Sequence, residues 1–209
     1  MLHLILVSPD SSFYEAAQWR FRDFPEVEVV RGKFEELPYY DCVITAGNSF
    51  GLMDAGMDLA VLKFFGRDLQ DRIQDRILSD FLGEQPVGTS ILVESGNSSH
   101  PWVAHSPTMR VPLNISRTDN VYLAFWATLC AIHQHNRDKE KKIKSVVCPG
   151  LGTGTGGMDP MEAALQIRLA YTNYLSVPEF INGSFAQRRH ESVHYGSNWG
   201  FENPRSTVD

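Results

Sequence analysis

Two glycine-rich segments of the chain combine small polar and acidic residues in a pattern that suits anion binding. The first runs from Thr45 to Asp58 and the second from Pro149 to Asp159, and each follows an apolar run and precedes an amphipathic one. Glycine permits positive φ angles and lets a ligand come close to the backbone. Amide groups at the start of a helix favour anions. Either segment alone could be a simple tight turn. Because both lie where a strand leads into a helix, we predict that together they form an anion-binding site.

The elements around these loops alternate as in an α/β layer fold. Strands are predicted at 2–7, 27–30, 42–45, 90–94, 102–105 and 143–148, and helices at 12–21, 57–82 with a break near Gly66, 120–136 and from Asp159-Pro160 onward. The turn-rich residues 95–99 predict a hairpin between two of the strands. In such sheets ligands bind at the carboxyl ends of the strands. Two loops facing one crevice there suit an anionic ligand with more than one phosphate.

Residues 152–157 also satisfy the GxGxxG pattern, which on its own indicates a dinucleotide-binding Rossmann unit. That unit needs a further strand after the helix and an acidic residue about 20 positions on. Residues 171–178 give no convincing strand, and no Gly-Lys-Ser/Thr follows the loop as a P-loop would require. A Rossmann-type NAD oxidoreductase is the remaining alternative of this kind, and it predicts a strand after the last helix.

Bulk properties exclude several classes of protein. The formal net charge is -6 and no block of Lys and Arg occurs, so general nucleic-acid binding is not expected. Cys42, Cys130 and Cys148 show no CxxC spacing, and no HExxH motif occurs, so neither a disulfide framework nor a metal site is predicted. The apolar amino terminus is too short to span a membrane and lacks a basic leader. We expect a cytoplasmic chain without cofactor or membrane partner, its oligomeric state open.

Taken in order, these motifs resemble the macrodomain family. The segment from Cys42 to Asn48 is similar to the family's strand ending in Asn-Ala-Ala-Asn, and Gly56-Met57-Asp58 to its Gly-Val-Asp. Residues 103–107, Val-Ala-His-Ser-Pro, resemble the family's His-Ala-Val-Gly-Pro. Residues 148–157 resemble its strand end and Ser-Thr-Gly-Ile-aromatic-Gly loop. The similarity covers about residues 27–175.

The resemblance implies an α/β three-layer sandwich, a mixed β-sheet between helices, with ADP-ribose or an ADP-ribosylated substrate across its crest. It implies that Asn48 hydrogen-bonds the distal ribose and that Asp58 lies near that ribose and a water, which makes both catalytic candidates. The ligand-binding residues that it implies are Ala46, Gly47, Gly56, Met57, Gly152, Thr153, Gly154, Thr155, Gly156 and Gly157.

Structural roles compete with these assignments, and three positions depart from the family pattern. Asp58 could be a helix cap, and Asn48 could close an Asx-turn. Lys33 stands where the family usually has the Asp that contacts adenine, so base recognition is expected to differ. Thr45 replaces the first Asn of the family motif. Gly156 stands where many members carry an aromatic residue, which would leave the distal ribose more open.

Two functions follow from the resemblance. The first is hydrolysis of an ADP-ribosyl linkage, and the second is a non-catalytic module that reads or sequesters ADP-ribose. The macrodomain is predicted over residues 1–176, with 177–209 as an irregular extension packed on the same domain. Four aromatic residues of the extension either pack on the domain or close over the pocket, namely Phe185, Tyr195, Trp199 and Phe201.

Overall fold

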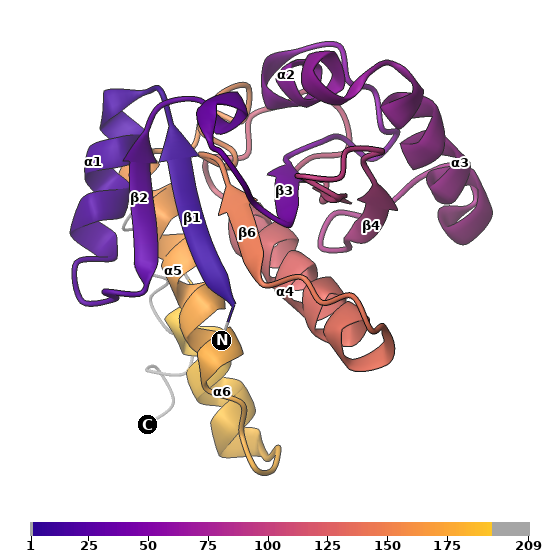
Figure 1. The fold of residues 1–209 in the computed structure, drawn as a ribbon. Coiled ribbons are helices and arrows are strands. Elements are labelled where there is room, and N and C mark those ends of the chain that lie inside the picture. The colour runs from indigo at the N-terminus through magenta and orange to yellow at the C-terminus, as the bar shows by residue number, and fades with distance from the viewer. Residues whose placement is uncertain (1, 194–209) are drawn as a thin grey trace.

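The computed structural model describes residues 2–193 and confirms the α/β class (Figure 1). The strands are β1 (His3–Ser8), β2 (Val27–Arg31), β3 (Cys42–Thr45), β4 (Ile91–Glu94), β5 (Trp102–His105) and β6 (Ser145–Cys148). The helices are α1 (Ser11–Arg20), α2 (Gly56–Phe65), α3 (Asp68–Phe81), α4 (Asn120–Asp138), α5 (Pro160–Leu175) and α6 (Gly183–Ser192), and a 3-10 turn, η1, spans Phe34–Glu36.

The strands form one six-stranded sheet in the order β2-β1-β6-β3-β5-β4. All neighbours pair in parallel except β4 and β5, which form the predicted antiparallel hairpin. The sheet is therefore mixed, and five parallel strands end at the same edge. The arrowheads of β1, β2 and β6 point to that edge in Figure 1.

Side chains alternate across the sheet, so each strand contributes to two separate apolar layers. Leu4 and Leu6 of β1 pack on the face covered by α1, α4 and α5. Ile5 and Val7 of the same strand pack on the opposite face with α2 and α3. The result is a three-layer sandwich (Figure 1). Within residues 2–193, no helix combines the length and apolarity needed to cross a bilayer.

Helix boundaries follow local signals that the sequence carries. The Asp159 carboxylate accepts hydrogen bonds from the amides of Met161 and Glu162, at 2.9 and 3.2 Å, and Pro160 occupies the first position of α5. Gly66 separates α2 from α3 with a φ of +100°, a value that favours glycine. Both boundaries agree with the predicted cap and the predicted break.

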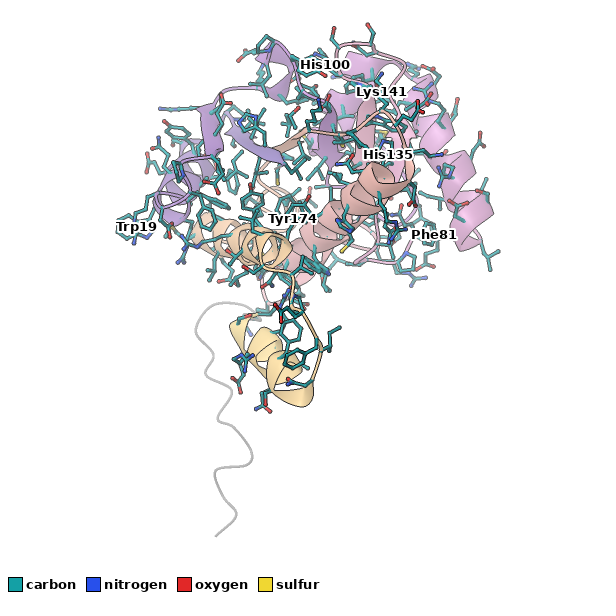
Figure 2. The ribbon with its side chains drawn as sticks, turned by 60° about the horizontal axis from the view of Figure 1, so that its bottom comes forward. Trp19, Phe81, His100, His135, Lys141 and Tyr174 are labelled. Carbon is teal, nitrogen blue, oxygen red and sulfur yellow. The ribbon has the colours of Figure 1, made fainter. Side chains whose placement is uncertain are left out.

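The prediction of an irregular carboxyl-terminal extension is wrong for Gly183–Ser192, which form α6. Figure 2 shows this helix standing apart from the sheet and its covering helices. Its contact with them includes Arg189, whose guanidinium lies 5.4 Å from the Trp126 ring centroid on α4. Among the described residues α6, and not a strand, follows α5, contrary to the Rossmann alternative. Tyr195, Trp199 and Phe201 lie outside the described residues.

Asp41 joins the amino-terminal ends of β3 and β6. Its Oδ2 accepts from the amides of Lys144 and Ser145, at 2.7 and 2.9 Å, and its Oδ1 accepts from the Tyr39 hydroxyl. Burial alone would raise the pKa of this carboxyl, but the hydrogen bonds outweigh burial and hold the pKa below its ordinary value.

We predict that Asp41→Ala lowers the free energy of unfolding by about 1–3 kcal/mol at pH 7, because the buried amide of Ser145 and the partly buried amide of Lys144 lose their acceptor. The native pKa lies below the unfolded value, so this stabilisation is present above about pH 4 and is lost as pH falls through the native pKa. Urea unfolding of parent and variant between pH 3 and 7 measures the difference. Equal stability at pH 7 would contradict this account.

Candidate functional site

A cavity of about 790 Å³ lies at the edge of the sheet where the parallel strands end. The predicted residues that line it are Ala46, Gly47, Asn48, Gly56, Met57, Asp58, Gly152, Thr153, Gly154, Thr155 and Gly156. The two glycine-rich loops, about 100 residues apart in the sequence, therefore share one hollow. Gly157 is absent from the lining.

The order of the strands sets the order of the residues along the cavity. The segments after β2, β1, β6, β3 and β5 contribute, in that spatial order, Lys33, Pro9, Gly154, Ala46 and Thr108. The β6 loop therefore lies between the β2 end and the β5 end. Helix α2 and the residues before it form a further wall. A ligand along this crest would contact several loops at once.

The β6 loop presents backbone donors that the protein leaves unused. Within residues 2–193, the amides of Gly154, Thr155 and Gly156 donate to no protein acceptor, whereas the neighbouring amides of Thr153 and Gly157 bond the carbonyls of Gly150 and Gly154. Successive free amides form an anion-binding concavity. The start of α5 does not supply donors of this kind, because Asp159 already caps it.

A second set of free donors comes from the start of α2. The first hydrogen bond of this helix runs from Leu59 N to Ala55 O, so the amides of Gly56, Met57 and Asp58 have no acceptor among the described residues. All three residues line the same cavity as the β6 loop. Six amide donors without a protein acceptor thus belong to residues that line one space, at the positive end of a helix dipole, and this favours an anion with several oxygens.

Glycines of the β6 loop differ in what surrounds them. A Cβ on Gly154 would meet no protein atom within 4 Å, whereas one on Gly156 would lie 2.5 Å from Gly152 O and 2.8 Å from Ile115 Cγ1. The aromatic side chain that many family members carry at the position of Gly156 has no room here. Gly157 has a φ of +61° and backs onto the Asn114 amide, which explains why it lies outside the cavity lining.

Asn48 holds its own loop in place. Its Oδ1 accepts from the amides of Phe50 and Leu52, at 3.1 and 3.3 Å, and its Nδ2 donates to Leu52 O at 2.8 Å. This is the Asx-turn geometry that the sequence offered as an alternative. One Nδ2 hydrogen has no acceptor among the described residues, so the amide can still donate to a ligand.

Asp58 does not cap α2, because Ala55 is the cap residue and no side chain bonds there. The carboxylate instead accepts a short hydrogen bond from the Thr45 hydroxyl at the end of β3. Burial raises the pKa of Asp58 to about 6, and the hydrogen bond from Thr45 opposes that rise. A carboxylate with this pKa can exchange a proton near neutral pH. Thr45, which the sequence marked only as a departure, is its partner.

The side chain of His105 leaves no room for a side chain at Gly47. A Cβ at Gly47 would lie 2.3 Å from Nε2 of His105, a residue buried at the end of β5. The His105 Nδ1 bonds Gln85 Oε1 at 2.7 Å, and Gln85 Nε2 donates to His105 O. Burial lowers the pKa of His105 to about 4, so the ring is neutral. The histidine therefore supports the floor of the loop.

Several lining residues escaped the sequence analysis. They are Ser8, Pro9, Glu35, Asp54, Lys63, Thr108, Met109 and Pro112. The last three follow β5, where Met109 forms an isolated parallel bridge with Asn48. The similarity of residues 103–107 to a family motif could have indicated these three residues, because the chain that follows the motif must pass the edge of the sheet where the parallel strands end.

Comparison with known proteins agrees with this architecture. The model of the Macro domain family matches residues 44–167. An uncharacterized protein of Aquifex aeolicus is 31% identical over 139 residues, which cover 66% of this chain and 76% of that protein.

Solved structures give the same fold. The macrodomain of Mycobacterium tuberculosis DarG superposes with a TM-score of 0.57 at 19% identity, covering 68% of this chain and 87% of that one. Thermosipho africanus DarTG in complex with ADP-ribose gives 0.56 at 21% identity, covering 71% of this chain and 39% of that one. Because the family model matches more than half of the sequence and the sheet, loops and cavity agree with it, this chain belongs to the macrodomain family.

Proposed function

We propose that this chain binds ADP-ribose in the cavity described above and hydrolyses an ADP-ribosyl linkage there. The observation that carries the binding proposal is that two sets of amides without protein acceptors, in Gly56–Asp58 and Gly154–Gly156, belong to residues that line one cavity. Amides without protein acceptors need a ligand or water as partner. A diphosphate supplies acceptor oxygens on both sides. The complex of Thermosipho africanus DarTG with ADP-ribose, on the same fold, supports the identity of the ligand.

The order of residues along the cavity orients that ligand. With the diphosphate at the β6 loop, the base extends towards Lys33 at the β2 end. The distal ribose then lies towards Asn48 and Asp58, which belong to the β3 side. The free Nδ2 hydrogen of Asn48 donates to a ribose hydroxyl in this arrangement.

Asp58 supplies the chemistry in this proposal. Its carboxylate orients a water molecule and accepts a proton from it as the water oxygen bonds C1 of the distal ribose. The bond from C1 to the leaving group breaks, and the leaving group departs with the bonding pair. The hydrogen bond from Thr45 keeps the carboxylate in position. The amides contribute by holding the diphosphate still, since correct positioning alone lowers a barrier substantially.

A test has a binding part and a chemical part. Calorimetric titrations with ADP-ribose, AMP and NAD should show tightest binding for ADP-ribose, because only it places both a diphosphate and a free ribose in the cavity. Single-turnover incubation with an ADP-ribosylated protein should then release ADP-ribose. Absence of heat with all three nucleotides would overturn the binding proposal. Tight binding without release would assign a reader in place of a hydrolase.

A further inference from the structure

Two lysines lie on adjoining segments of the cavity rim at the β2 end. Lys33 follows β2 and precedes Phe34, and Lys63 lies on α2 and precedes Phe64. The Phe34 and Phe64 rings meet edge-on, with centroids 5.4 Å apart. This contact fixes the two segments against each other. Both lysines are exposed, and both line the cavity.

Neither ammonium group is committed to a carboxylate of the described chain. Several arginines are paired, for example Arg110 with Glu84 and Arg76 with Asp80, both at 2.6 Å, whereas no lysine within residues 2–193 forms an ion pair. Glu35 lines the same rim, yet within residues 2–193 no ion pair joins it to Lys33 or Lys63. In a chain of net charge -6, two free cations at one end of a cavity point to an anionic group on the ligand.

The position of this rim identifies which part of the ligand carries that group. Strand β1 alone separates β2 from β6, so the rim lies about 10 Å from the diphosphate loop, two strand spacings away. The nucleoside half of a ligand whose diphosphate lies at the β6 loop extends over about this distance. Lysine donates hydrogen bonds and accepts none, so it cannot receive the amino hydrogens of adenine. A phosphate dianion on the nucleoside ribose suits two ammonium groups better than a neutral base does.

We propose that the Lys33–Lys63 rim binds a phosphate on the adenosine ribose, so that the preferred ligand is an ADP-ribosyl group phosphorylated at the 2′ or 3′ position. This inference rests on the proposed function, because it takes the diphosphate to lie at the β6 loop. It adds a substrate class that plain ADP-ribose binding does not require.

The test compares ADP-ribose with ADP-ribose 2′-phosphate by calorimetry, on the parent and on the double variant Lys33→Gln, Lys63→Gln. The parent should bind the phosphorylated ligand at least 10-fold more tightly than ADP-ribose in low salt, and in the double variant the ratio of the two affinities should fall to about 1. Lys139→Gln, Lys141→Gln is the matched control, with the same change of charge beyond the end of α4 (Figure 2, Lys141). Adenosine 2′,5′- and 3′,5′-bisphosphate, compared with AMP, assign the position.

Three outcomes would overturn the inference. They are equal affinity for the two ADP-ribose ligands, a preference that survives in the double variant, and tighter binding of GDP-ribose than of either, since guanine O6 and N7 accept from lysine. Failure of the parent to bind any of these nucleotides would instead remove the proposed function itself, so the two failures are distinguishable.

Discussion

Asp58→Ala is expected to slow the release of ADP-ribose from a modified protein by about 10²–10⁴-fold, the usual contribution of a general base. Affinity for ADP-ribose should change only a few-fold, because the amides of the α2 start and the β6 loop are backbone groups that remain. Single-turnover release measures the first effect and calorimetry the second. Parent-like release by the variant would contradict the role of Asp58.

The pH dependence of the parent adds a second readout. The carboxylate is the active form, and burial raises its pKa to about 6. The single-turnover rate should therefore rise between pH 5 and 7, with its midpoint near 6, and level off above. The residual rate of Asp58→Ala should lack this rise. A parent profile that falls with pH over this interval would require the protonated acid as the active form.

As pH rises, the contribution of Asp58 to the free energy of unfolding should fall while the hydrolysis rate increases. The native pKa of Asp58 lies above the unfolded value near 4, so ionising this buried group costs stability as pH rises through the native pKa. Asp58→Asn keeps an acceptor for Thr45 without the charge, and it should raise the free energy of unfolding by about 1–3 kcal/mol at pH 7.5. The gain should disappear near pH 4, where Asp58 is protonated in the folded protein. Urea titrations at both pH values measure it.

Local patterns made most of the fold predictable. Short apolar runs located all six strands, and the Asp159-Pro160 pair located the start of α5. Helix α6 was not predicted, because none of its residues is buried and its sequence therefore lacks the periodic apolar positions that indicate a helix. Its only local signal is the cap, Asn182, whose side chain accepts from Phe185 N at 2.8 Å.

The site was predictable as two loops but not as a set of side chains. Glycine and strand ends are local features, whereas the partner of Asp58 is 13 residues away and that of His105 is 20. Lys63 illustrates a further limit. Its type and its helix could be read from the sequence, but which side of α2 faces the cavity depends on how Phe64 packs against Phe34.

Gly154→Val is expected to abolish ADP-ribose binding, with a loss of at least 100-fold in affinity, while the fold persists. No protein atom lies within 4 Å of the added Cβ, and the φ of Gly154 is not in the left-handed region, so the chain can accept the side chain. The valine would, however, occupy the cavity where the proposed diphosphate meets the free amides of the β6 loop. Calorimetry and thermal unfolding, measured on the same sample, separate the two effects.

Two other glycines make the comparison decisive. Gly183→Val also adds a side chain in open space, but on α6, so it should leave binding unchanged. Gly156→Ala forces a Cβ against Gly152 O and Ile115, which should cost about 1–3 kcal/mol of stability and weaken binding through the distorted loop. If Gly154→Val bound ADP-ribose as the parent does, the diphosphate could not lie against this loop. The amide sets that face the cavity would then need another ligand.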